Sequence, residues 1–215
     1  MKSVFPRAGL ALLCGVILSA CGGSGSNGSL QLTGSITGLV RSGLVLINRS
    51  TGEKLPVTSG TQVFVFTRFL STDEQFNVDI DTQPDGTTCT ASQNNDKASV
   101  YTYNRTVITC NLNPWTLGGT VTGLADDGVA GNNDGVTLAN GPDTVYVGPS
   151  TTPGADVKFT FANTVGQGAP YGVTVLAQPI NRTCTITAPV TGGVAGAGLM
   201  PAGNYSGLIV ACAPK

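Results

Sequence analysis

Oxygen-donating side chains gather in one short stretch of the chain, and the chemistry they offer is the binding of a hard cation. Residues 126–135 read DDGVAGNNDG. Asp and Asn oxygens are ligands that Ca²⁺ prefers, so Asp126, Asp127, Asn132 and Asp134 are the candidate ligands. The stretch lacks the late bidentate Glu of an EF-hand, and Asn-Asp-Gly sequences also form plain polar turns. We favour the polar turn, with no metal bound, and keep a Ca²⁺ loop as the alternative.

Groups for catalysis are scarce elsewhere. The chain has no histidine, which removes Ser-His-Asp and Cys-His catalysis, most zinc sites and the commonest general base. No lysine lies in a Ser–Lys motif, and there is no P-loop or dinucleotide fingerprint. Asp79, Asp81 and Asp85 resemble the carboxylates of a glycosidase, but we expect the first two on the wet face of a strand, as solvated charge. The sequence therefore predicts a protein that is not an enzyme and has no cofactor.

The N-terminus has the parts of a secretory signal. A basic start precedes an apolar run over residues 8–18 and small residues before Cys21. The run is too short to cross a bilayer comfortably as a helix. Its end, Leu18-Ser19-Ala20-Cys21, resembles the lipobox of bacterial lipoproteins. The resemblance implies a cleaved signal peptide over residues 1–20 and a lipidated Cys21 that anchors the chain in the bilayer. An ordinary signal peptide is the alternative.

A tether is predicted directly after the anchor. Residues 21–30 read CGGSGSNGSL, and a Gly/Ser-rich composition is typical of a flexible linker. In such lipoproteins an Asp after the cysteine implies retention in the inner membrane. This chain has Gly22 there, so the resemblance implies the outer membrane, with the leaflet left open.

The charge of the mature chain argues against one class of partner. Removing residues 1–20 takes away Lys2 and Arg7, which leaves nine basic residues against twelve acidic ones, a net formal charge of −3. A mildly acidic chain without a Lys/Arg cluster lacks the electrostatic footprint of nucleic-acid binding. The sequence predicts no nucleic-acid partner.

The remaining chain repeats itself, because segments of its first part return in the same order in the second. The pairs are LTGSITGL at 32–39 with LGGTVTGL at 117–124, GLVLIN at 43–48 with GVTLAN at 135–140, FVF at 64–66 with FTF at 159–161, FNVDIDTQP at 76–84 with YGVTVLAQP at 171–179, and TCT at 88–90 with TCT at 183–185. Chance similarity between two Gly/Thr-rich halves is the alternative. We predict two homologous domains, residues 31–113 and 114–215, divided near Asn113-Pro114-Trp115.

Each repeat is predicted to be built from strands. Phe76, Val78 and Ile80 alternate with polar residues, as expected for a strand with one buried face. Strand-sized runs recur between Gly, Asn, Asp and Pro, and charged residues make up only 11% of the chain. Six or seven short strands in each repeat indicate an immunoglobulin-like sandwich, with a small antiparallel barrel as the alternative. The expected fold is all-β: two tandem Ig-like antiparallel β-sandwich domains.

The predicted roles of the cysteines follow from the signal and the repeats. Of the six cysteines, Cys14 leaves with the signal and Cys21 takes the lipid. The other four allow three pairings, and the repeat symmetry selects Cys89–Cys110 and Cys184–Cys212. Export supplies the oxidising setting, and each bridge should contribute about 3 kcal/mol.

The repeat also resembles one that is common in bacterial surface proteins and lipoproteins. GTVTGL at 119–124, YGVTV at 171–175 and QP at 178–179 carry the likeness, and the first repeat departs from it at Phe76 and Asp79-Ile80. The resemblance implies an extracytoplasmic module with no single assigned activity. We therefore predict an envelope lipoprotein whose modules serve structure or protein interaction, with an unidentified envelope or surface protein as partner.

Two loops and one aromatic residue are the basis for an alternative function, the binding of a ligand. A glycan- or Ca²⁺-binding module would use residues 126–135 or the glycine-rich stretch Thr191–Gly203, which is predicted to be a long hairpin or loop. Trp115 is either a recognition aromatic or, as we favour, a residue packed between the two sandwiches.

Overall fold

The computed structural model describes residues 28–129, 131–152 and 154–215. The predicted signal peptide, Cys21 and most of the tether lie outside these residues. All the regular elements described are β-strands, which confirms the predicted all-β sandwich class. In the described part of the chain, no helix has the length and apolar character needed to cross a membrane.

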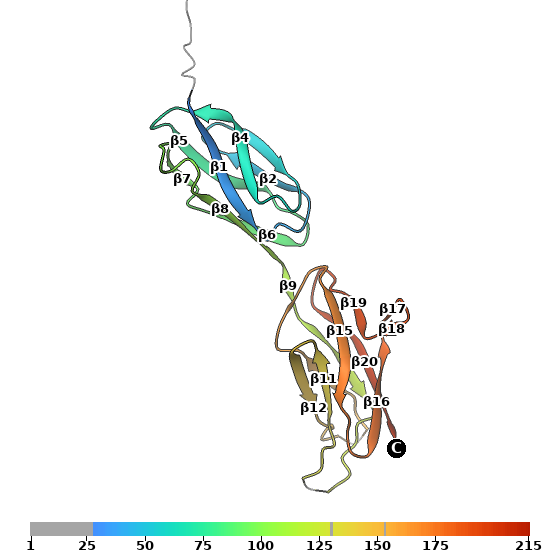
Figure 1. Ribbon diagram of the computed structural model, residues 1–215. Helices are drawn as coiled ribbons and strands as arrows, with labels where there is room; N and C mark the ends of the chain where they lie inside the picture. The colour runs from blue at the N-terminus through green and yellow to red at the C-terminus, as the bar shows by residue number, and fades with distance from the viewer. Residues whose placement is uncertain (1–27, 130, 153) are drawn as a thin grey trace, which may run out of the picture.

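Two four-stranded sheets form the N-terminal half, residues 28–113 (Figure 1). One has the order β4-β1-β8-β6, built from β1 (Leu30–Thr37), β4 (Val63–Leu70), β6 (Thr87–Ser92) and β8 (Thr106–Leu112). The other has the order β3-β2-β5-β7, built from β2 (Leu44–Asn48), β3 (Glu53–Val57), β5 (Gln75–Thr82) and β7 (Asn95–Lys97).

The C-terminal half, residues 114–215, has two sheets in the corresponding order. The first, β13-β10-β20-β16, contains β10 (Leu117–Thr122), β13 (Val157–Thr160), β16 (Arg182–Ala188) and β20 (Tyr205–Pro214). The second, β12-β11-β15-β19, contains β11 (Val136–Asn140), β12 (Asp143–Val147), β15 (Pro170–Ala177) and β19 (Ala197–Leu199). Two short pairs complete it: β9 (Pro114–Trp115) with β14 (Val165–Gly166), and β17 (Val190–Thr191) with β18 (Val194–Ala195).

The strand order differs in detail from an immunoglobulin domain. In the constant-type immunoglobulin order the first strand pairs with the second in one sheet, whereas here β1 lies between β4 and β8. The sheets are also not purely antiparallel, because β1 runs parallel to β8 and β10 runs parallel to β20. Each half has more strands than the six or seven predicted, since short edge strands such as β7 and β19 are added.

Each half has its own hydrophobic cluster between its sheets. In the N-terminal cluster Phe64 and Phe66 meet edge to face with ring centroids 5.8 Å apart, and Phe159 and Phe161 repeat that geometry in the C-terminal cluster. Of the three residues predicted to face inward, Phe76 and Val78 are fully buried and Ile80 is partly buried against the cluster. The corresponding residues Tyr171 and Val173 are also buried, as are Leu44 with Leu46 and Val136 with Leu138. Burial of these alternating side chains is the main force that holds the sheets together.

The turns that follow β1 and β10 both require glycine, for a steric reason. Gly38 and Gly123 have φ values of 74° and 73°, in the left-handed region that favours glycine. A Cβ at either position would overlap the carbonyl oxygen of the nearby Cys110 or Cys212. Here the repeated Thr-Gly-Leu motif lets the chain turn away from the sheet directly beside a disulfide.

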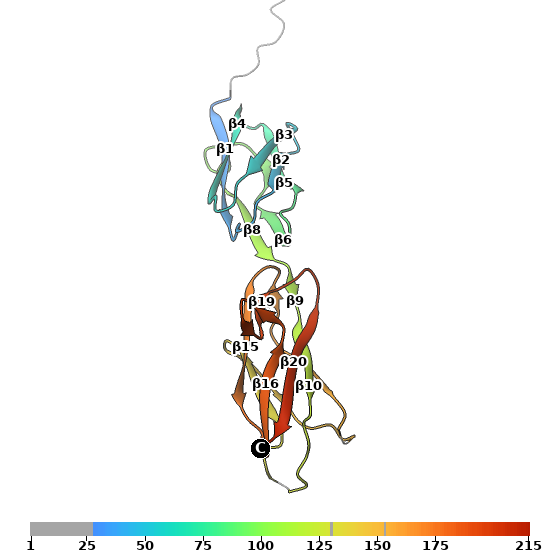
Figure 2. The same ribbon diagram turned by 90° about the vertical axis from the view of Figure 1, so that its right-hand side faces the viewer.

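Figures 1 and 2 show the two halves joined end to end through β9. Strand β1 begins at the end of the N-terminal half that lies away from the C-terminal half. Strand β20 ends at the end of the C-terminal half that lies away from the N-terminal half (Figure 2).

Candidate functional site

Both predicted disulfides are present. Cys89 in β6 lies directly opposite Cys110 in β8, and Cys184 in β16 lies directly opposite Cys212 in β20. The S–S distances are 2.06 and 2.04 Å, and the paired Cα atoms are 3.9 Å apart in both bridges. Each bridge therefore fastens an edge strand to its neighbour in the same sheet. It does not join the two sheets as the immunoglobulin disulfide does.

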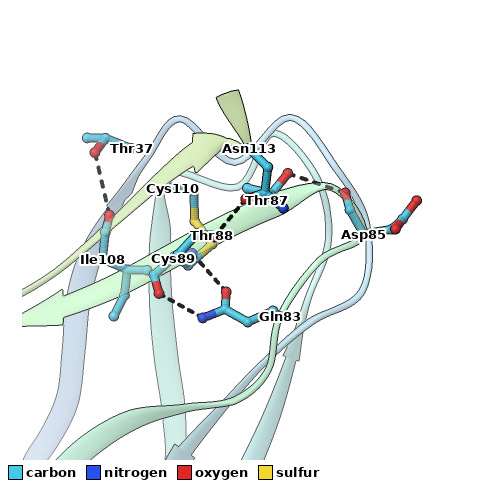
Figure 3. Close-up of a disulfide and its surroundings, with 9 residues drawn as sticks. All are labelled: Thr37, Gln83, Asp85, Thr87, Thr88, Cys89, Ile108, Cys110 and Asn113. Atoms are coloured by element: carbon cyan, nitrogen blue, oxygen red, sulfur yellow. Dashed lines mark hydrogen bonds between the residues drawn. A yellow bond between two sulfur atoms is a disulfide. The ribbon is translucent and has the colours of Figure 1, made fainter. Parts of the chain in front are cut away.

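In each half a glutamine side chain forms hydrogen bonds with the backbone of one disulfide cysteine, and Figure 3 shows this for Gln83 and Cys89. Cys89 N–H donates to Gln83 Oε1 at 2.8 Å, and Gln83 Nε2 donates to the Cys89 carbonyl at 2.9 Å. Gln178 makes the same two bonds to Cys184, at 2.7 and 2.9 Å. The amide takes the place of a neighbouring strand, because β6 and β16 are edge strands whose outer N–H and C=O groups need partners.

The sequence shows that this glutamine recurs in both repeats, but it does not show what the side chain does. The Gln-Pro pair recurs in both repeats, and we used it only as a marker of repetition. All four cysteines of the described chain are oxidised, so none of these cysteines offers a thiol for catalysis or metal binding. The cysteine sites are structural.

The junction between the halves is held by hydrogen bonds through Asn113. Its side chain accepts a bond from the Thr88 hydroxyl at 2.7 Å, and its N–H donates to the Gly86 carbonyl at 2.9 Å. The Asn113 carbonyl accepts from Gln167 N–H at 2.8 Å. Arg41 Nη2 also donates to the Gln167 carbonyl, at 3.2 Å. The β14 turn of the C-terminal half is therefore tied to the N-terminal half.

Trp115 packs differently from the prediction. It is partly buried against the C-terminal cluster and is not part of the N-terminal one. Its indole N–H donates to Gln167 Oε1 at 3.4 Å. The expected packing between two sandwiches is therefore wrong in detail: Trp115 supports the turn that carries Gln167, and Gln167 in turn contacts the N-terminal half.

Three of the four candidate metal ligands come together in the loop between β10 and β11. One carboxylate oxygen from each of Asp126, Asp127 and Asp134 lies within 4.8 Å of the others. Asp126 and Asp127 are exposed, whereas Asp134 is 8% exposed. Burial, followed by the charges of Asp127 and Asp126, raises the pKa of Asp134.

Asn132, the fourth candidate, positions a carboxylate. Its Nδ2 donates to Asp127 Oδ2 at 2.8 Å. The predicted polar turn is also present, because Gly128 N–H donates to Asp126 Oδ1 and Val129 N–H donates to Asp127 Oδ1, at 2.7 and 2.8 Å. The neighbouring Asn133 fixes the loop to the following part of the sheet, since its Nδ2 donates to the Gln178 carbonyl at 3.2 Å.

The remaining candidate carboxylates lie at the surface. Asp79 and Asp81 lie on the wet face of β5, paired with Arg49 and Lys54 at 2.7 and 2.8 Å, and Asp85 is exposed. The stretch Thr191–Gly203 forms part of the β17–β18 hairpin and then β19, which pairs with β15 at the sheet edge. A hairpin was predicted there, but the added edge strand was not.

A scan against protein-family models and a search of curated proteins found no match for this chain.

Proposed function

We propose that this chain is a membrane-anchored envelope lipoprotein that displays two disulfide-bridged β-sandwich modules for structural support or protein interaction, without catalysis. In this proposal residues 1–20 are a cleaved signal peptide and Cys21 carries the lipid. The modules span residues 31–113 and 114–215, and the Gly/Ser-rich residues between the anchor and β1 are a tether.

The pair of disulfides is the observation that carries the proposal. Disulfides persist outside the cytoplasm and are rare in cytosolic proteins. Cys89–Cys110 and Cys184–Cys212 therefore support export, which the signal-like residues 1–20 predict independently. Leu18-Ser19-Ala20-Cys21 then leaves Cys21 as the acceptor for lipid, and more than one acyl chain would be needed for firm anchoring.

The division into two modules is supported by the separation of the two hydrophobic clusters. The N-terminal cluster runs to Cys110, the C-terminal cluster begins with Leu117 and the partly buried Trp115, and the sheets of both halves have the same order. A non-catalytic role is supported by the absence of histidine from the sequence and by the oxidation of the four described cysteines.

Metabolic labelling with a radioactive fatty acid tests the anchor. The wild-type chain should incorporate label, Cys21→Ser should lose it, and Cys14→Ser should keep it, because Cys14 lies inside the predicted signal. An unlabelled wild-type chain, or a labelled Cys21→Ser variant, would contradict the proposal.

Membrane fractionation tests the outer-membrane location. The wild-type chain should sediment with outer-membrane markers, and Gly22→Asp should shift it toward inner-membrane fractions. Protease treatment of intact cells, compared with lysed cells, then assigns the leaflet: digestion only after lysis places the modules in the periplasm.

A further inference from the structure

We propose that the loop between β10 and β11 binds a Ca²⁺ ion through the carboxylates of Asp126, Asp127 and Asp134. The inference does not depend on lipidation, because it rests on the C-terminal half alone. It reverses our preference from the sequence, where a plain polar turn was favoured. The reason lies in Asp134.

Asp134 is a buried acid with an unused oxygen. It is 8% exposed, and its Oδ1 has no hydrogen-bond partner among the described residues. A buried polar acceptor without a partner is unfavourable, and a buried charge more so. Its side chain is directed into the cluster, since its ligand oxygen lies within 4.8 Å of those of Asp126 and Asp127. A cation bound at the cluster would be coordinated by the Asp134 carboxylate and would offset its buried charge.

Among the described residues, none of the three carboxylates takes part in an ion pair. The three ion pairs of the described chain are Arg49–Asp79, Lys54–Asp81 and Arg68–Glu74, all in the N-terminal half. Like charges this close repel one another. Folding nevertheless places the three acids together, and a divalent cation would convert that repulsion into attraction.

The spacing of the oxygens suits Ca²⁺. Ca²⁺ binds oxygen at about 2.4 Å, so two of its ligand oxygens lie at most about 4.8 Å apart. The three oxygens lie within that limit of one another. Mg²⁺ usually takes only one or two protein carboxylates and keeps several waters, so a cluster of three carboxylates favours Ca²⁺.

The loop also prearranges the ligands. Gly128 N–H donates to one oxygen of Asp126, and Val129 N–H donates to one oxygen of Asp127. A carboxylate that accepts one hydrogen bond still has lone pairs for a metal ion. Asp126 and Asp127 are exposed, so water can reach the cluster and supply the remaining ligands. With three protein carboxylates and the rest water, we expect a Kd in the range of about 0.1–1 mM, which is typical of extracellular modules.

Calorimetry and thermal unfolding of the full chain in detergent test the site, with CaCl₂ as the probe. Trp115 is the single tryptophan and packs in the C-terminal half, so its fluorescence follows the half that holds the site. At about 10 mM Ca²⁺ the Trp115 transition should rise by about 6–20 °C. MgCl₂ at the same concentration should raise it much less.

Asp134→Asn should abolish the Ca²⁺ response while the variant stays folded without Ca²⁺, because the substitution removes one of three repelling charges. Asp85→Asn makes the same chemical change at an exposed position of the N-terminal half and should respond like the wild type. The proposal is overturned if Ca²⁺ gives neither heat nor a shift in the wild type. It is equally overturned if Asp134→Asn responds fully, or if Mg²⁺ acts as strongly as Ca²⁺.

Discussion

The connection that follows the first long strand differs most between the two halves. In the N-terminal half residues 38–43 join β1 to β2, and Arg41 from this short loop reaches the Gln167 carbonyl of the C-terminal half. In the C-terminal half residues 123–135 occupy the corresponding place between β10 and β11 and bring three carboxylates together. The flanking strands keep the same partners in both halves. The same arrangement of strands thus supports two different loops: one that contacts the other half and one that is acidic. Such variation is expected in loops, where functional residues are concentrated.

Charge shows the same contrast. The described ion pairs fall in the N-terminal half, where Asp79, Asp81 and Glu74 each face a cation. In the C-terminal half three acids, Asp126, Asp127 and Asp134, lie close to one another instead. Arginine and lysine therefore offset acidic side chains in the first half, whereas we propose that a Ca²⁺ ion does so in the second.

The largest effect should come from removing one disulfide at a time. Cys89→Ala/Cys110→Ala should lower the free energy of unfolding of the N-terminal half by about 3 kcal/mol, and Cys184→Ala/Cys212→Ala should do the same for the C-terminal half. The bridges span 21 and 28 residues, so loop entropy predicts losses that differ by only about 0.3 kcal/mol.

Two signals separate the halves in that experiment. Far-UV circular dichroism follows both halves, whereas Trp115 fluorescence follows the C-terminal one, because Trp115 packs against that cluster. Denaturant titration of the first variant should displace the circular dichroism transition and largely spare the fluorescence. Equal displacement of both signals in both variants would show that the halves unfold as one unit.

The two glutamines should give the next largest effect. Gln83→Ala and Gln178→Ala each remove two hydrogen bonds from an edge cysteine. Because the glutamines are exposed and water can partly replace them, we expect a loss of about 1–2 kcal/mol in the half concerned. Gln62→Ala, at an exposed glutamine whose side chain forms no hydrogen bond within the described residues, is the matched control. A loss in only one half would show that the two edges differ in stability despite the same bonds.

The sequence predicted the features that depend on neighbouring residues. Alternation placed Phe76 and Val78 in the core, where both are fully buried, and the order of the repeats gave the correct cysteine pairs. These succeeded because a strand has a fixed period of two and because similar sequences adopt similar pairings. The Gln-Pro pair was visible, but the unpaired backbone of Cys89 was not, because that depends on β6 being an edge strand.

Features that depend on distant contacts were missed or misjudged. The parallel pairing of β1 with β8 joins segments separated by a long stretch of chain, and no local pattern encodes it. Asp134 has the residue type and neighbours of an exposed turn. Its burial accompanies contacts that hold the loop against the β15–β16 connection, where Ile180 N–H donates to the Asn133 carbonyl at 2.8 Å.

The junction should give a smaller effect that crosses between the halves. Arg41→Ala removes the bond to the Gln167 carbonyl and should lower the stability of the C-terminal half by about 1 kcal/mol, read from Trp115 fluorescence, although Arg41 belongs to the N-terminal half. Arg105→Ala, at an exposed arginine of the same half, should leave that signal unchanged. If both variants behave alike, the Arg41 contact does not couple the halves.

The smallest effect should come from the ion pair of Asp79. Arg49 Nε donates to Asp79 Oδ2 and Ile80 N–H donates to Oδ1, both at 2.7 Å, and these bonds lower the pKa of Asp79. Both partners are about half exposed, at 54% and 41%, so Asp79→Asn should cost only about 0.5 kcal/mol at pH 7.

The pH dependence of that difference follows from the sign of the shift. A carboxyl whose pKa is lower in the folded state stabilises the fold above its unfolded pKa of about 3.9. The stabilisation disappears as the pH falls through the folded pKa. The gap between wild type and Asp79→Asn should therefore close in acid and shrink in about 1 M salt, where exposed charges are screened. A gap that persists unchanged in acid would mean that Asp79 acts through its hydrogen bond with Ile80 N–H. In that case the charge of the Arg49 pair would contribute nothing measurable to the N-terminal half.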